Sequence, residues 1–150
     1  MQEPQDWAIR ATRIRESFAR QAMMRTLGAE LAELAPGRAV IRLPLAEHLG
    51  QQHGFAHAAA SFAIGDSAAG YAALGLMEPG QEVLTVEMKI NLMAPAIGSL
   101  LVAEGRVIRP GRRITVVAAE VFAEDGSGSR RQVALLQGTM IPVTDERVRD

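Results

Sequence analysis

The 150-residue sequence contains no cysteine. Disulfide bonds, thiolate metal sites and cysteine nucleophiles are therefore excluded. The sequence also lacks any run of about 18 apolar residues, the length that a membrane-spanning helix requires. Its formal net charge of -1 gives no electrostatic argument for binding nucleic acid or an anionic membrane. The segment Met1–Trp7 is acidic and has no apolar centre like that of a signal peptide, so we expect a cytoplasmic protein.

Three further kinds of site find little support in the sequence. The histidines at positions 48, 53 and 57 are the only imidazole groups, and without cysteine they form a poor zinc set, so we expect no metal. No Gly-x-Ser-x-Gly motif is present, which argues against a serine esterase of the α/β-hydrolase kind. A glycine-rich phosphate-binding motif between a strand and a helix is also missing.

The residues that are present fit one folded domain spanning residues 1–150. A chain of this length can enclose one sizeable core, and its 48% hydrophobic and 22% charged residues are typical of a globular protein. Apolar residues at helical spacing predict an N-terminal helix over about residues 4–27. A long central helix is expected from 57 to 76, where Met77–Gly80 ends it. Alternating patterns predict strands over 38–45, 82–92, 100–108, 114–123 and 132–143, followed by a polar tail over 144–150.

Short turns join the last four strands, so neighbouring strands are expected to be antiparallel. The strand at 38–45 is expected near an edge of the sheet because it contains Pro44. One antiparallel sheet against one long helix is an α+β arrangement. The long helix has few large side chains, and Gly65, Gly70 and Gly75 each cost about 1 kcal/mol of helix propensity relative to alanine. We therefore expect a curved sheet that wraps closely around this helix.

The most unusual residue is Asp66, a carboxylate in an alanine- and glycine-rich stretch of the long helix. An ionised carboxylate is costly in apolar surroundings unless something pairs with it or uses it. The residues three and four positions away are Phe62, Ala63, Ala69 and Gly70. An ion pair along the helix surface is therefore disfavoured. Two interpretations remain open: Asp66 has a structural role, at a buried backbone group or a subunit seam, or it is a catalytic carboxylate.

The start of the long helix is a second candidate. At His57 and Ala58 the first backbone amides have no partner within the helix, so they form a site for negative charge. Taken alone, His57 is most simply a polar residue in a helix-initiating loop. Ala58 precedes Asp66 by eight residues, about 12 Å along a helix. One helix cannot present both groups to one small reacting centre, so a shared site needs Asp66 from one subunit and the helix start from another.

A pattern of short motifs extends over most of the chain, from about Phe18 to Val143. The segments that carry it are Leu27–Gly28, Gln52–His57, Ala63–Ala73, Leu84–Ala96, Val107–Arg112 and Ala134–Thr139. Together these segments resemble the PaaI-type branch of the hotdog-fold acyl-CoA thioesterases. The resemblance implies a long helix wrapped by a five- or six-stranded antiparallel sheet. It also implies a homodimer or a dimer of dimers, with active sites at the dimer seam.

The resemblance implies roles for five residues. Asp66 corresponds to the carboxylate that activates water or attacks the thioester carbonyl. His57 and Ala58 align with the start of the family's His-Gly-Gly motif, whose first glycine donates its amide to the thioester oxygen. Thr85 falls where the family has serine or threonine near the carboxylate, and Gln51 where a polar amide helps to place water. This chain has alanine in place of both glycines. The backbone amide survives that change if φ is negative there, while the added methyl group narrows the space that receives the thioester.

A second group of residues is implied in binding coenzyme A. Its members are Gln52, His53, Arg109, Gly111, Arg112 and Arg113. Arginine side chains suit phosphate oxygens, although from the sequence alone the arginines are more simply a charged, exposed turn. Gln52 is also an alternative to Gln51 for placing water. Coenzyme A is expected as part of the substrate, and no separate cofactor is implied.

The leading hypothesis is a thioesterase that hydrolyses an acyl-CoA to a carboxylic acid and free CoA. The alternative is a non-catalytic acyl-CoA-binding hotdog protein, a sensor or a scaffold, which the two alanines at the helix start favour. A hydratase or dehydratase on the same fold is a third hypothesis, for which His57 is wrongly placed. Neither nucleic acid nor a membrane is an expected partner. The acyl group stays open, and its pocket is expected to be shaped by Phe55, Phe62, Met88 and Met93.

Overall fold

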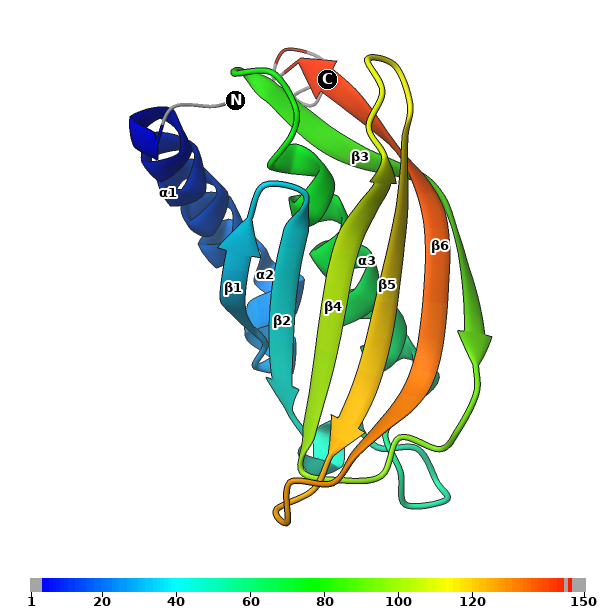
Figure 1. Ribbon diagram of the computed structural model, residues 1–150. Coiled ribbons are helices and arrows are strands. Elements are labelled where there is room, and N and C mark those ends of the chain that lie inside the picture. The colour runs from blue at the N-terminus through cyan, green and yellow to red at the C-terminus, as the bar shows by residue number, and fades with distance from the viewer. Residues whose placement is uncertain (1–3, 145, 147–150) are drawn as a thin grey trace.

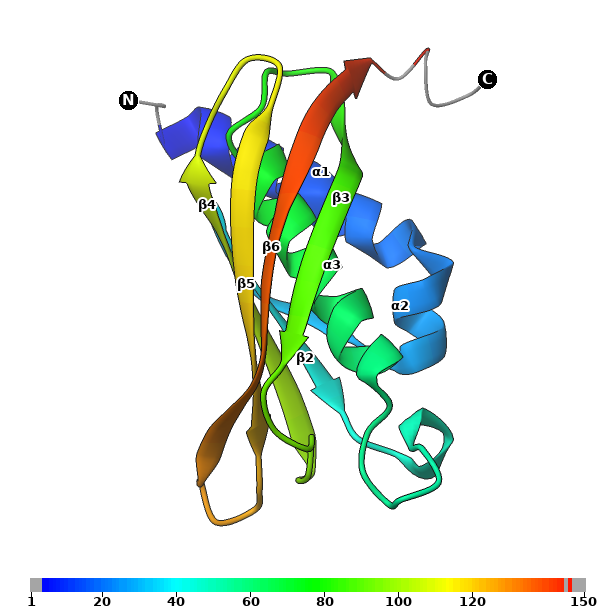
Figure 2. The same cartoon turned by 90° about the vertical axis from the view of Figure 1, so that its right-hand side faces the viewer.

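A computed structural model describes residues 4–144 and 146 of the chain (Figure 1). Its centre is the helix α3 (Ala58–Leu74), around which a six-stranded antiparallel sheet curves (Figures 1 and 2). In sheet order the strands are β1 (Glu30–Ala35), β2 (Arg38–Pro44), β4 (Leu100–Arg109), β5 (Thr115–Glu124), β6 (Arg130–Thr144) and β3 (Gln81–Leu92). The predicted α+β architecture, a long helix wrapped by an antiparallel sheet, is confirmed.

The N-terminal segment forms two helices where the sequence predicts one over 4–27. The first is α1 (Pro4–Arg20) and the second is α2 (Ala22–Leu27). They are separated by Gln21, whose backbone is extended (φ -74°, ψ 100°). This break directs the Gln21 amide toward α3, where it donates to the Tyr71 hydroxyl at 3.3 Å. At the other end of the chain, the polar tail predicted over 144–150 lies outside the described residues except for the last residue of β6 and position 146.

The edge strand β1 is not predicted by the sequence pattern. It lies at one edge of the sheet, and its residues do not alternate between buried and exposed. The expectation that β2 lies near an edge is confirmed: β2 is second from the edge and pairs with the edge strand β1 on one side and with β4 on the other. The pairing with β1 ends at Arg42, opposite Glu30, so Pro44 lies beyond it. Proline has no backbone N–H, and at position 44 this absence costs no hydrogen bond with β1.

Close contact between α3 and the sheet explains why the helix is built from small residues. A Cβ atom added at Gly65 would lie 2.8 Å from Leu136 Cδ2. The sheet also has a glycine where it meets the helix: a Cβ atom added at Gly105 of β4 would lie 2.2 Å from the backbone carbonyl carbon of Ala68. The predicted close wrapping is therefore confirmed on this side of the helix. At Gly70 the nearest atoms would be 3.9 Å away, so that part of α3 is less tightly covered.

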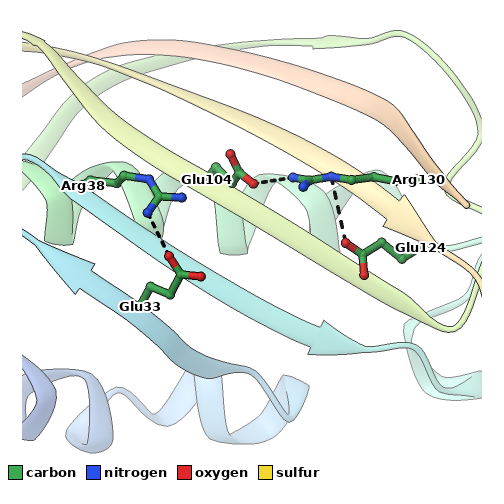
Figure 3. A network of polar contacts seen from close by, with 5 residues as sticks. All are labelled: Glu33, Arg38, Glu104, Glu124 and Arg130. Carbon is green, nitrogen blue, oxygen red and sulfur yellow. Dashed lines mark hydrogen bonds and ion pairs between the residues drawn. The ribbon is translucent and has the colours of Figure 1, made fainter. Parts of the chain in front are cut away.

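The outer, convex surface of the sheet carries ion pairs between neighbouring strands (Figure 3). Arg38 pairs with Glu33 at 2.8 Å across β2 and β1. Arg130 contacts both Glu104 and Glu124, the second at 3.9 Å. These side chains are partly exposed, so each pair adds little stability, about 0–1 kcal/mol. These ion pairs lie on the solvated face of the sheet, beside the partly exposed Leu135, which pairs with Glu120.

The opposite edge of the sheet, strand β3, is long and apolar. Leu84, Val86 and Leu92 are 46%, 57% and 57% exposed. Val86 lies at a bulge, where the pairing with β6 shifts between Thr85 and Glu87. An uncovered apolar edge strand is a template for pairing with another chain. No helix within the described part of the chain is long and apolar enough to span a membrane.

Candidate active site

The side chain of His57 caps the start of α3. Its backbone is extended (φ -64°, ψ 142°), and its ring Nδ1 accepts a hydrogen bond from Ala59 N at 2.9 Å. Because Nδ1 accepts, the neutral ring carries its proton on Nε2. The cap satisfies one of the amides that a helix start leaves unpaired. This contact explains His57 structurally, and its catalytic role stays a prediction.

The amide of Ala58 is the unpaired donor at this helix start. Ala59 N donates to the His57 ring and Ala60 N donates to the His57 carbonyl at 3.0 Å. Ala58 N donates to no residue within 4–144 or 146. Every non-glycine residue in these ranges has a negative φ, so alanine occupies this position without backbone strain. A polar N–H at the positive end of the helix dipole is thus available to an anionic oxygen.

A cleft of about 530 Å³ opens beside this amide. Its apolar walls include Phe55, Leu92, Met93 and Val133. Its polar lining includes Gln51, Gln52, His57, Ala58 and Ser61. Four of the predicted site residues therefore come together at the start of α3. Of the side chains expected to shape an acyl pocket, Phe55 and Met93 line this cleft and Phe62 and Met88 do not.

Asp66 lies two turns farther along α3 and contacts the edge strand β3. Thr85 Oγ1 donates a hydrogen bond to Asp66 Oδ1 at 2.8 Å. The same hydroxyl lies 3.2 Å from Met140 Sδ in β6, which is a second acceptor. No other hydrogen bond reaches the Asp66 side chain from the part of the chain that the structure describes. The predicted proximity of Thr85 and Asp66 is confirmed, and the second carboxylate oxygen is left free for a further partner.

The surroundings of Asp66 shift its pKa in two opposite directions. Burial raises the pKa of Asp66 above its ordinary value of 3.8, and the hydrogen bond from Thr85 opposes this with a smaller lowering effect. A carboxylate with a raised pKa is a better proton acceptor near neutral pH than an ordinary one. The interpretation in which Asp66 hydrogen-bonds a buried backbone group finds no such bond among residues 4–144 and 146.

The two halves of the predicted site are separated within one chain. Ala58 and Asp66 are both on α3, eight residues apart. At 1.5 Å per residue this separation is about 12 Å along the axis. A thioester carbonyl held at the Ala58 amide is therefore out of reach of the Asp66 carboxylate of the same chain.

The arginines expected to bind coenzyme A lie at the far end of the molecule. Arg109, Arg112 and Arg113 are exposed and belong to the β4–β5 hairpin, at the top of Figure 1, whereas α3 begins at the bottom. Gly111 makes this hairpin tight, since a Cβ there would lie 2.1 Å from the Ile114 carbonyl oxygen. Within one chain these residues therefore do not join the cleft.

The loop before α3 holds the remaining predicted residues in place. Gln51 N donates to the Phe55 carbonyl at 2.9 Å, and the Gln51 side-chain oxygen accepts from His53 N. The His53 ring stacks on Phe55 with centroids 6.3 Å apart. Gln52 and His53 are both exposed, and of the two only Gln52 lines the cleft. The loop therefore places both glutamines next to the helix start.

Sequence reasoning missed several residues at these sites. They include Ser61, Leu92 and Val133 in the cleft, and Met140 beside Thr85. Leu92, Val133 and Met140 become neighbours of the site only through strand pairing, which no local pattern reveals. Ser61 carries a local indication, because it is a hydroxyl among alanines in the first turns of the helix.

Known proteins similar to this chain share its fold. The crystal structure of a thioesterase family protein from Silicibacter pomeroyi is 42% identical, with a TM-score of 0.87 over 90% of this chain and 98% of that chain. The 1,4-dihydroxy-2-naphthoyl-CoA hydrolase of Listeria monocytogenes is 28% identical over 68% of this chain and 83% of its own length.

A third comparison concerns the fold alone. The E. coli PaaI protein from the phenylacetic acid degradation operon is 20% identical, with a TM-score of 0.75 over 85% of this chain and 88% of that chain. This likeness confirms the predicted PaaI-type hotdog fold. Residues 53–129 match the family model of the thioesterase superfamily, and this range contains α3, β3, β4 and β5. The chain therefore belongs to the thioesterase superfamily.

Proposed function

We propose that the protein hydrolyses an acyl-CoA thioester to a carboxylic acid and free CoA, in the cytoplasm. The observation that carries the proposal is Asp66, a half-buried carboxylate with a raised pKa that one hydrogen bond from Thr85 orients. A raised pKa and a free carboxylate oxygen are properties that a general base or a nucleophile requires. Membership of the thioesterase superfamily supports thioester hydrolysis as the reaction class.

The active site is composite in this proposal, and its second half comes from a second copy of the chain. Two β3 edges paired antiparallel would continue the sheet and cover Leu84 and Val86. The two-fold axis of such a dimer reverses one subunit relative to the other. The α3 start of one subunit then lies near the middle of α3 in its partner. This arrangement removes the separation of about 12 Å that keeps Ala58 and Asp66 apart within one chain.

The same reversal gives the arginine hairpin a role. Arg109, Arg112 and Arg113 would lie at the same end of the dimer as the partner's cleft. Their guanidinium groups can then bind the phosphates of coenzyme A. Gly111 keeps the hairpin tight. Gln52 borders the cleft from the loop before α3, and the exposed His53 stacks on Phe55 of the cleft wall, from where both can contact coenzyme A. The acyl group would enter the cleft, and the CoA moiety would extend over the dimer surface.

The mechanism follows from where charge develops. The thioester oxygen accepts the Ala58 N–H, which typically stabilises an oxyanion by about 2.7–4 kcal/mol. Water placed by Gln51 attacks the carbonyl carbon while Asp66 takes its proton, or Asp66 attacks directly and water then cleaves the anhydride. Collapse of the oxyanion breaks the C–S bond, and the leaving thiolate takes up a proton to give free CoA. Both routes require Asp66 to be ionised.

The substrate class draws support from one relative. The Listeria monocytogenes protein is named for hydrolysis of an aromatic acyl-CoA, 1,4-dihydroxy-2-naphthoyl-CoA. The walls of the cleft, which include Phe55 and Met93, suit an apolar or aromatic acyl group. An aromatic acyl-CoA is therefore the first class to assay.

One observation favours a second candidate function, a non-catalytic acyl-CoA-binding protein. The methyl groups of Ala58 and Ala59 stand where the resembling family has two glycines. They narrow the approach to the amide, although the N–H itself is preserved and unpaired. Tight acyl-CoA binding without turnover would support this function over hydrolysis.

The deciding experiment measures thiol release from aromatic and medium-chain acyl-CoA thioesters. The wild-type protein should release CoA, and Asp66→Ala should lose about 10²–10⁴-fold in kcat, the usual contribution of a positioned base. Asp6→Ala, at an exposed carboxylate of α1, is the matched control and should hydrolyse at the wild-type rate. Hydrolysis that is unaffected by Asp66→Ala would contradict the proposed mechanism.

A further inference from the structure

Ser61 is a buried polar side chain that the proposed mechanism does not use. Its residue is 2% exposed, and it lines the cleft together with Leu92 and Val133. Its hydroxyl forms no hydrogen bond with any of residues 4–144 or 146. Within the same ranges, every fully buried side-chain nitrogen or oxygen has a partner. The Ser61 hydroxyl must therefore reach open space, and the open space beside it is the cleft.

A helical hydroxyl with no ligand to bind has a simpler option. It can donate to the carbonyl one turn earlier, as Thr12 does to the Ala8 carbonyl at 3.0 Å. Ser61 does not do so, and the carbonyl one turn earlier, that of His57, accepts from Ala60 N instead. An unpaired hydroxyl against apolar walls is costly, and alanine would fit the same space. A ligand that supplies the missing partner explains why a hydroxyl is there.

We infer that Ser61 is a specificity-determining residue whose hydroxyl bonds a polar substituent of the acyl group in the cleft. The inference rests on the proposed function, because it takes the Ala58 amide as the site of the thioester oxygen. Ser61 follows Ala58 by three residues, about 4.5 Å along the helix axis. The substituent therefore lies only a few bonds from the carbonyl carbon. The substrate class is an acyl group, apolar except for one nearby hydroxyl or carbonyl, such as a hydroxylated aromatic acid.

The test compares benzoyl-CoA with its three ring-hydroxylated isomers in the thiol-release assay. The wild-type protein should hydrolyse at least one isomer with kcat/KM about tenfold above benzoyl-CoA, the effect of one gained hydrogen bond. Ser61→Ala should abolish that preference, because kcat/KM falls about tenfold more for the preferred isomer than for benzoyl-CoA. Ser67→Ala is the matched control, since it removes a hydroxyl of α3 that donates to Gln21 at 3.3 Å outside the cleft. This control should keep the preference.

Two results would overturn the inference. One is a wild-type protein that prefers no hydroxylated isomer, including one that hydrolyses only unsubstituted aliphatic chains. The other is a preference that survives Ser61→Ala, or an equal loss for benzoyl-CoA and its isomers, which would mean a structural role. Failure of the proposed function looks different: the folded wild-type protein would release no thiol from any aromatic or aliphatic acyl-CoA.

Discussion

Replacing Ala58 by proline deletes the proposed oxyanion donor without disturbing the helix. Ala58 is the first residue of α3, a position at which proline is favoured because its N–H is not needed by the helix. The preceding residue, His57, has φ -64° and ψ 142°, which suits a residue before proline. The change therefore removes one N–H, and removal of one oxyanion donor typically lowers kcat by about 10²–10³-fold, or about 2.7–4 kcal/mol.

The assay measures kcat at saturating acyl-CoA, with thermal unfolding as the check on folding. Ala58→Pro should unfold within a few degrees of the wild-type protein. Ala58→Gly keeps the amide and should retain activity. Ala58→Val keeps the amide but adds bulk comparable to the proline ring. It therefore distinguishes an effect of side-chain bulk on kcat from the effect of losing the N–H donor. A folded Ala58→Pro variant with wild-type kcat would refute the role of this amide.

Three further outcomes are expected. Thr85→Val removes the hydrogen bond that lowers the Asp66 pKa, so that pKa should rise further and the acidic limb of the kcat/KM profile should move to higher pH; an unmoved limb would contradict this. Because burial raises the folded-state pKa above 3.8, stability should fall as pH rises from below 3.8 through the raised pKa. Asp66→Asn should therefore unfold at a higher temperature than wild type at pH 7, with the advantage vanishing in acid. Gly105→Ala places a Cβ 2.2 Å from the Ala68 carbonyl carbon, so chemical denaturation should show a free energy of unfolding lower by about 3 kcal/mol or more. Gly126→Ala, with open space around the added Cβ, should lower it by less than about 1 kcal/mol.

The long helix and five of the six strands follow from the sequence because their patterns are local. Period-two alternation in β3 and β5, and small residues along α3, each point to one structure. The edge strand β1 escapes this reasoning because neither of its faces is fully buried. The break at Gln21 escapes it too, and the Gln21 side chain bonds Tyr71, 50 residues away, a contact that no local pattern indicates.

The site divides in the same way between local and distant causes. Helix geometry alone separates Ala58 from Asp66, so the hypothesis that a shared site would need two subunits follows from the sequence. The pairing of Thr85 with Asp66 depends on how β3 lies against α3, and it was reached only through a family resemblance. Met140 joins this group through the register of β6 with β3, where it pairs with Thr85. Register is set by the whole sheet, which explains why no segment of sequence predicts that contact.

Complementation between two inactive subunits tests the composite site most directly. Asp66→Ala and Ala58→Pro subunits are each expected to form inactive homodimers. A mixed dimer has one site with both defects and one site with neither. Random mixing makes half of the dimers mixed, so the mixture should regain about one quarter of wild-type activity. If Asp66 and Ala58 of the same subunit formed the site, every site in the mixture would carry one defect, and thiol release would stay at the level of the separate variants.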